Sequence, residues 1–212
     1  MASGAGWIEH PDRYRYILYA PTFRDSEVDK PRIAMDIERV MSGLPEDVIL
    51  MLRLHPHVAK AMRERGETGG SDGSGSLQGL PDRVIDVSGY RGVTTLLSAA
   101  DVLITDYSSI IFEYVVTKKP MIFYAYDLDD FRENGRDFYE PYEDFVPGPV
   151  VRDEAGLIRE INAALDKSDA FEKTAETFIS DNFQYLDGRA AERIADIAFG
   201  TVSRRYARKN RI

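Results

Sequence analysis

One segment of the chain, Asp101–Glu113, has the pattern of a buried strand, a polar turn and the start of a helix. The run Val102–Ile104 is short, apolar and partly β-branched, which favours a strand that is covered on both faces. Ser108 or Ser109 is well suited to cap the helix that follows. A covered strand that leads directly into a helix is typical of a parallel α/β sheet, so this segment constrains the fold more than any other.

The rest of the chain repeats this alternation of strands and helices. Further strands are predicted at 16–20, 48–54, 83–87 and 121–124, and helices between them at 33–41, 58–65 and 93–100. Three more helices are expected at 154–165, 171–178 and 188–199. This order predicts an α/β fold, with a Rossmann-like parallel sheet, helices on both faces of the sheet and a helical C-terminus.

Changes in composition divide the chain into one domain and its flexible parts. We expect residues 1–15 to be a flexible leader, 16–200 to be the Rossmann-like domain and 201–212 to be a basic tail. Residues 66–80 are rich in Gly and Ser and predict a flexible loop, because this composition cannot bury a core. Residues 125–149 form a long aromatic and charged loop, which in a compact domain favours a functional role.

Composition also restricts the class of protein. The chain has 212 residues, 43% of them hydrophobic, and no cysteine, which fits one core and an expected cytoplasmic location. A net charge of -9 argues against a nucleic-acid partner, whereas a small phosphorylated ligand needs only local positive potential. No apolar stretch is long enough to span a bilayer. The basic tail is interpreted either as a solvated end or as a peripheral contact with the inner face of the cell membrane.

Polar side chains follow three of the predicted strands. Thr22 and Arg24 follow the first strand, His55 follows the second, and Ser108 and Ser109 follow the strand at 102–104. The carboxyl ends of parallel strands meet at one edge of a sheet, where such folds bind ligands. A helix start can bind phosphate, and a histidine beside it can donate a hydrogen bond or a proton to a leaving phosphate. The alternative is a serine that only caps a helix and a loop histidine without a task. Several clusters at one edge favour a phosphate site.

Six short motifs resemble, in the same order, those of the CDP-glycerol glycerophosphotransferases, the teichoic acid primases and polymerases. They are Tyr19–Arg24, Leu52–Pro56, Asp101–Ser109, Ile122–Asp127, Arg136–Tyr139 and Pro147–Pro149. The His-Pro and Ser-Ser pairs are also similar to motifs of bacterial CMP-sialic acid sialyltransferases. Both resemblances imply a cytidine nucleotide. The first implies a GT-B fold, in which two Rossmann-like domains face each other across a cleft, and the chain resembles the C-terminal, nucleotide-binding domain.

The resemblance also implies roles for particular residues. Ser108 and Ser109 would bind the donor phosphate at the start of the helix. His55 would contact the phosphate of the departing CMP and neutralise charge as the bond breaks. Arg132 and Arg136 would supply positive charge to the donor phosphates from the long loop.

Four further residues complete the implied site. Asp127 and Glu113 would hold hydroxyls of the glycerol or the ribose, and Thr22 and Arg24 would line the same cleft. Structural alternatives stay open for several of these positions. Arg136 could pair with an acid in its own loop, and Glu113 could be a helix residue that faces solvent.

In the implied reaction, an acceptor hydroxyl attacks the β-phosphorus of CDP-glycerol and CMP is released. No cofactor or metal is implied. The implied partners are the cytidine nucleotide donor, a polyol-phosphate or glycan acceptor of teichoic acid or capsule-type polymer, and an N-terminal GT-B domain. That domain would carry the histidine that activates the acceptor, so we expect the chain to bind donor but to transfer little alone. Two alternatives are a glycosyltransferase domain for CMP- or UDP-linked sugars and a non-catalytic nucleotide-binding module.

Overall fold

The structure of the chain is a computed structural model that describes residues 13–24, 32–64, 68–69, 76–77, 81–133, 138–166 and 169–209. The chain divides into two compact units, Met1–Glu176 and Thr177–Ile212. Nearly all of the expected leader lies outside the described residues, and so do the last residues of the expected basic tail. The expected domain limits at residues 16 and 200 remain predictions.

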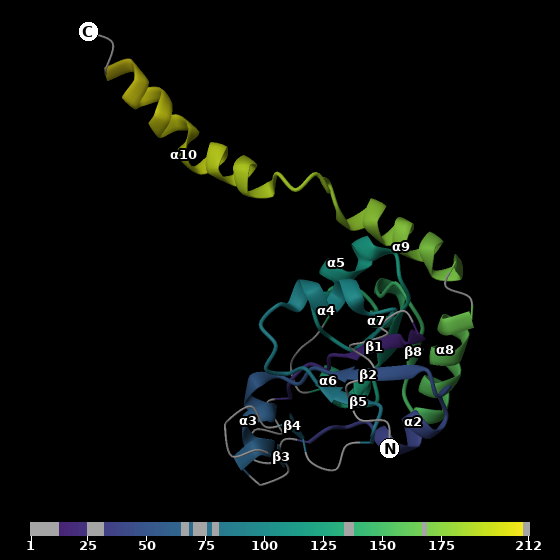
Figure 1. Ribbon diagram of the computed structural model, residues 1–212. Coiled ribbons are helices and arrows are strands. Elements are labelled where there is room, and N and C mark those ends of the chain that lie inside the picture. Colours follow the sequence, from purple (N-terminus) through teal and green to yellow (C-terminus); the bar gives the residue numbers. More distant parts are fainter. Residues whose placement is uncertain are drawn as a thin grey trace. The chain divides into compact units, whose positions relative to one another are not determined.

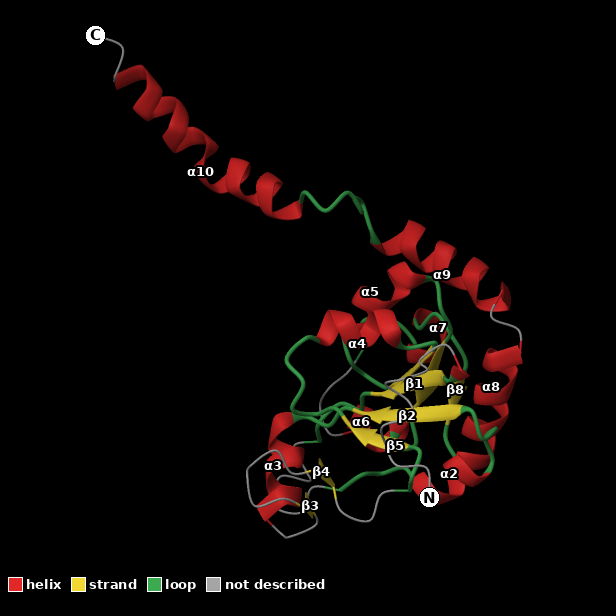
Figure 2. Cartoon of the chain, viewed as in Figure 1, coloured by secondary structure: helices red, strands yellow, loops and turns green. Residues whose placement is uncertain are grey.

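The first unit is built on a parallel sheet with the strand order β5-β2-β1-β6-β7-β8, drawn as yellow arrows in Figure 2. Its strands are β1 (Arg15–Tyr19), β2 (Val48–Leu52), β5 (Val84–Asp86), β6 (Val102–Thr105), β7 (Met121–Tyr124) and β8 (Val150–Val151). Every residue of β2, β6 and β7 is buried, as expected for strands covered on both faces. The predicted parallel α/β fold is therefore confirmed.

Helices cover both faces of this sheet. They are α2 (Ile37–Ser42), α3 (Pro56–Glu64), α4 (Val93–Ala99), α5 (Ile110–Tyr114), α6 (Leu128–Glu133), α7 (Tyr142–Phe145) and α8 (Glu154–Asp166). Alternate strand residues such as Leu50 and Ile104 share one hydrophobic core with Val40 of α2 and Leu157 of α8. In Figure 1, α2 and α8 lie together on one side of the sheet, and α4 and α5 lie on another. The sheet is thus the middle of three layers.

Several local features differ from the expectation. The predicted helix at 33–41 begins later, at Ile37, because Asp36 caps it by accepting a hydrogen bond from the Arg39 N–H (3.0 Å). The Gly/Ser-rich segment contains a short antiparallel pair, β3 (Thr68–Gly69) and β4 (Ser76–Leu77), and the rest of it lies outside the described residues. The long aromatic loop at 125–149 contains α6 and α7. Short helices of this kind carry too little hydrophobic periodicity to be predicted from the sequence.

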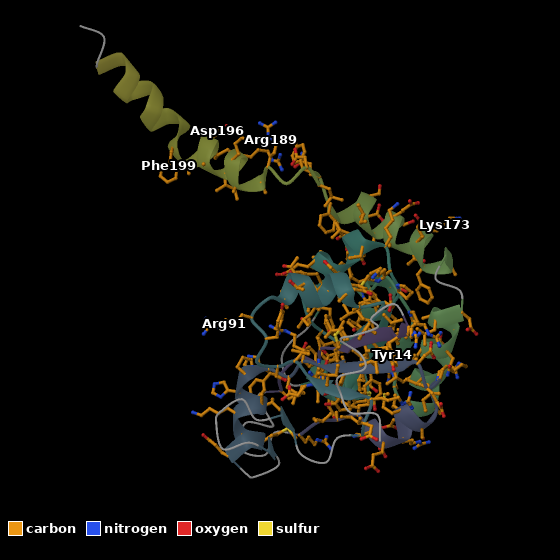
Figure 3. The ribbon with its side chains drawn as sticks, in the orientation of Figure 1. Tyr14, Arg91, Lys173, Arg189, Asp196 and Phe199 are labelled. Atoms are coloured by element: carbon orange, nitrogen blue, oxygen red, sulfur yellow. The ribbon has the colours of Figure 1, made fainter. Side chains whose placement is uncertain are left out.

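The second unit contains the end of α9 (Asp169–Asn182) and all of α10 (Ala190–Lys209). α10 carries the exposed apolar side chains Ile194, Ile197 and Phe199, and Phe199 projects from the helix in Figure 3. Among the described residues, no helix is both long and apolar enough to pass through a membrane. The three helices that the sequence predicts for the end of the chain are present as α8, α9 and α10.

Candidate phosphate-binding pocket

An open pocket of about 560 Å³ lies at the carboxyl ends of β1, β2 and β6. From β1 the chain moves through β2 to β5 on one side of the sheet, and then returns to build β6, β7 and β8 on the other. The strand order reverses beside β1, and open α/β sheets bind ligands at such a switch point. The wall of the pocket includes His55 from the segment after β2 and both Ser108 and Ser109 from the turn after β6. Three predicted site residues from two separate loops therefore meet around one space.

The ring of His55 is exposed at the pocket wall and held in a defined orientation. Its Nδ1 accepts a hydrogen bond from the backbone N–H of His57 (3.3 Å), and its ring stacks on Phe23 with 5.1 Å between the ring centroids. Because Nδ1 accepts, the neutral ring carries its proton on Nε2. The Nε2–H group is therefore the donor that His55 can offer to a ligand. Pro56, the first residue of α3, fixes the backbone directly after it.

The two serines differ in their bonding. Ser108 Oγ accepts a weak hydrogen bond from the Ile110 N–H (3.3 Å), so Ser108 caps the turn, as one of the two serines was expected to do. Ser109 is exposed and its side chain makes no capping hydrogen bond. Both side chains line the pocket. Within the described part of the chain, the Ser109 hydroxyl is not used in a cap and can bond to a ligand, and the Ser108 hydroxyl keeps its proton as a donor.

Thr22 also lies at the wall of this pocket. Its backbone N–H donates to Asp106 Oδ1 (2.8 Å), which fixes the loop after β1 to the turn after β6. Its buried Oγ1 has no hydrogen-bond partner among the described residues. A buried hydroxyl without a partner is unfavourable, so this atom is a candidate for contact with a bound ligand.

Arg24 is buried beside the pocket and binds two carboxylates. Its guanidinium donates to Asp127 Oδ2 (2.6 Å), to Asp106 Oδ2 (2.7 Å) and to the carbonyl oxygen of Thr22 (2.6 Å). Burial by itself lowers the pKa of Arg24, but the hydrogen bonds and charges of Asp127 and Asp106 outweigh it and raise that pKa. The guanidinium is thus permanently charged and already neutralised by protein groups.

The two acids respond differently to this arrangement. Complete burial raises the pKa of Asp106, against the attraction of Arg24 and the hydrogen bond from Thr22. Asp127 is less buried, so Arg24 outweighs desolvation and lowers the pKa of Asp127. Tyr107 adds a hydrogen bond to Asp127 Oδ1 (3.0 Å), and burial raises the pKa of Tyr107, which keeps its hydroxyl protonated. Phosphate binding by Arg24 and hydroxyl binding by Asp127 remain predictions, and these contacts favour a positioning role for both.

The structure places two other predicted residues, Glu113 and Arg132, outside the lining of the pocket. Glu113 is exposed on α5, in agreement with the alternative of a residue that faces solvent, and it does not line the pocket. Arg132 donates to Glu143 Oε2 (2.8 Å), so its charge is offset within the loop. Arg136 lies outside the described residues. Among the described residues, those that line the pocket belong to the loops after β1, β2, β5 and β6 and to the starts of α3 and α5.

Three polar lining residues were not identified from the sequence: Arg53, Ser88 and Tyr107. Arg53 stands two positions before His55, and in an extended segment this spacing places two side chains on the same face. That period of two is the signal that could have identified it. Ser88 Oγ accepts from the Leu54 N–H (2.9 Å), and this fixes the segment that carries His55. Within the described ranges, no group of three or more His, Asp or Glu side chains is arranged to hold a metal ion.

Comparison with known proteins adds independent information. The sequence profile described as CDP-Glycerol:Poly(glycerophosphate) glycerophosphotransferase matches residues 8–200. The chain is 37% identical over 195 residues to the teichoic acid ribitol-phosphate polymerase TarL of Staphylococcus aureus, covering 88% of this chain and 31% of that protein. It is 31% identical over 191 residues to the teichoic acid glycerol-phosphate primase of Bacillus subtilis, covering 90% and 45%. The chain thus spans about a third to a half of the length of these relatives.

Solved structures also show similarity to teichoic acid polymerases. The wall teichoic acid polymerase TagF superposes with a TM-score of 0.71 and 28% identity, over 93% of this chain and 46% of the TagF chain. A TagF variant soaked with CDPG superposes with a TM-score of 0.69 and 28% identity, over 92% of this chain and 44% of that chain. The matched part of TagF thus has the same fold as this chain.

Proposed function

Because the chain belongs to the CDP-glycerol glycerophosphotransferase family, we propose that it is the donor-binding domain of an enzyme that transfers glycerol phosphate from CDP-glycerol. The acceptor is a hydroxyl in teichoic acid or capsule-type polymer synthesis, and the second product is CMP. One observation carries the proposal: His55, Ser108 and Ser109 surround one pocket at the switch point of the sheet. A diphosphate needs hydrogen-bond donors from more than one direction, and this pocket offers them from two loops.

In this proposal, each of these donors has a task. The acceptor oxygen bonds to the β-phosphorus, the bond from that phosphorus to the bridging oxygen breaks, and CMP departs with the bridging oxygen. Negative charge grows on the departing phosphate, and the His55 Nε2–H offsets it by donating a hydrogen bond. The serine hydroxyls hold the phosphates in line. Positioning and charge stabilisation supply most of the catalysis in phosphoryl transfer.

Ribitol phosphate is the second candidate for the transferred group. Two relatives at 37% identity are a ribitol-phosphate polymerase and a ribitol-phosphate primase, while the glycerol-phosphate primase is 31% identical. Both groups would be linked to the same cytidine diphosphate, so the phosphate contacts described above are common to both donors. The identity of the polyol is decided at the far end of the donor, and direct comparison of the two donors is needed.

The chain supplies one side of the proposed reaction. Its sequence aligns with less than half of each relative reported above, and a GT-B enzyme binds its acceptor between two domains. We propose that an N-terminal domain provides the group that activates the acceptor hydroxyl. Without it, the chain binds donor but forms little product. The cytoplasmic location and a peripheral contact with the inner face of the membrane remain predictions.

A thermal-shift panel tests this proposal. We expect CDP-glycerol, a CDP-linked ribitol and CMP to raise the melting temperature of the chain, because a ligand that binds only the folded state stabilises it. UDP-linked sugars should leave the melting temperature unchanged. A shift with CMP- or UDP-linked sugars but not with CDP-linked polyols would instead identify a glycosyltransferase domain. No shift with any nucleotide would contradict donor binding altogether.

A further inference from the structure

Arg53 is the only lysine or arginine among the described residues that line the pocket. We propose that Arg53 binds a phosphate oxygen of the donor, and that the backbone carbonyl of Tyr90 sets the direction of its guanidinium. This inference rests on the proposed function, because it names a further ligand-binding residue of the same pocket. It adds a fixed positive charge to a site that otherwise offers neutral donors and one histidine.

Hydrogen bonds fix both the backbone of Arg53 and the guanidinium at the tip of its side chain. Its backbone N–H donates to the carbonyl oxygen of Tyr19 (2.9 Å), which continues the pairing of β2 with β1 beyond the last strand residue. Its NH1 donates to the carbonyl oxygen of Tyr90 (2.9 Å), in the segment after β5. The half-buried side chain therefore crosses from the end of β2 toward the end of β5 along one wall of the pocket. The serines stand at the end of β6, on the other side of β1.

The guanidinium of Arg53 keeps most of its binding capacity. A guanidinium has five N–H donors, and one of those of Arg53 is used by Tyr90. Among the described residues, no carboxylate forms an ion pair with it. A partly anchored arginine loses less freedom when it binds, and its planar fork matches a phosphate oxygen pair. Arg53 is thus oriented and charged before a ligand arrives.

The two other predicted cations that the structure describes, Arg24 and Arg132, do not have this capacity. Arg24 is bound to both Asp106 and Asp127, and Arg132 is bound to Glu143. A phosphate that approached either arginine would compete with a carboxylate already in contact. Because a donor diphosphate carries negative charge into the pocket, an unpaired cation at the wall is the favourable partner for it.

Calorimetric titration of the whole chain with CDP-glycerol tests the inference through Arg53→Gln and Arg53→Lys. The matched control is Arg91→Gln, because Arg91 is an exposed arginine of the neighbouring segment that does not line the pocket and that points outward in Figure 3. We expect Arg53→Gln to weaken binding by about tenfold or more, the effect of losing a charge-assisted hydrogen bond. Arg53→Lys should retain part of the affinity, and Arg91→Gln should change it less than about twofold.

Salt dependence separates phosphate binding from a merely structural role. If Arg53 contacts phosphate, affinity of the unmodified chain falls as salt is raised, and this dependence is smaller in Arg53→Gln. Weaker binding with an unchanged salt dependence would overturn the inference, and so would an affinity of Arg53→Gln equal to that of Arg91→Gln. In both cases donor binding by the unmodified chain would leave the proposed function intact. Absence of binding by the unmodified chain would overturn both. Circular dichroism melting compares the folding of the variants, and Arg53→Met, which also removes the charge, replaces Arg53→Gln in the salt series if the latter melts early.

Discussion

Arg24 and Asp127 form a two-point ion pair, with 2.6 Å from Nε to Oδ2 and 3.0 Å from the second guanidinium nitrogen, NH2, to Oδ1. The pair joins the loop after β1 to the loop after β7. Asp106 extends it, because it binds the Arg24 guanidinium and also accepts from the backbone N–H groups of Thr22 and Tyr107. Three loops at the carboxyl edge are thus held by one buried cation, and the pocket residues Thr22 and Tyr107 belong to two of these loops.

Removal of the Asp127 carboxylate should destabilise the first unit. Asp127→Asn leaves part of a buried guanidinium without its counter-charge, and breaking a buried ion pair costs about 3 kcal/mol. The side chains of Arg24 and Asp127 are only 7% and 16% exposed. Urea unfolding measures the loss. The control is Asp129→Asn, whose ion pair with Arg152 is exposed and should cost less than about 1 kcal/mol. Equal costs for the two variants would show that the buried pair has no special weight.

The same pair gives the stability a defined pH dependence. Arg24 lowers the pKa of Asp127 below its ordinary value of 3.8, so the folded state favours the ionised carboxylate. Its contribution is therefore complete above about pH 5, where the carboxylate is ionised in both states, and is lost as the pH falls through the lower pKa of the folded state. The difference in unfolding free energy between the unmodified chain and Asp127→Asn should shrink between pH 5 and about pH 2.5. A difference that stays constant over this range would contradict the shift.

The two neighbouring histidines should behave differently in nucleotide binding. His55→Ala removes the Nε2–H group at the pocket wall and should weaken CMP binding by about tenfold or more, the effect of one hydrogen bond to a charged group. His57→Ala keeps the backbone N–H that orients His55, and its ring does not line the pocket. Its affinity should stay within about threefold of the unmodified chain. Calorimetry with CMP gives both values, and the reverse order of effects would contradict the assigned roles.

The two serines should separate stability from binding. Ser108→Ala removes the oxygen that accepts from the Ile110 N–H, and a lost cap costs about 1 kcal/mol of stability. Ser109→Ala removes a hydroxyl without a capping bond, so the unfolding free energy should not change. Both variants should weaken CDP-glycerol binding. Chemical denaturation and calorimetry on the two variants test this, and a stability loss confined to Ser109→Ala would be inconsistent with the structure.

Much of the fold could be predicted because short apolar runs without charged residues indicate buried strands. Val102–Ile104 and Met121–Tyr124 contain no charged residue, and this pattern requires cover on both faces. His55 and Ser108 could be placed at one edge because each follows such a strand. The resemblance to a known family then gave the nucleotide class, which the family match supports.

The partners of charged side chains could not be predicted in the same way. Arg24 and Asp127 are 103 positions apart, and only the folded chain brings them together. An arginine with a free guanidinium and one in an ion pair look identical in a sequence, so the sequence assigns Arg132 to phosphate and does not identify Arg53. The order of strands and loops in the sequence indicates which residues lie at the carboxyl edge of the sheet. Which of these residues form ion pairs with each other depends on side-chain positions within a few ångströms.

A crystal structure of the chain soaked with CDP-glycerol shows directly whether the pocket binds the donor. We expect the diphosphate in the pocket after β1, β2 and β6, with a phosphate oxygen within hydrogen-bond distance of His55 Nε2 and another within reach of Ser108 or Ser109. A donor bound elsewhere on the chain, or bound here with its phosphates turned away from His55 and both serines, would contradict this expectation.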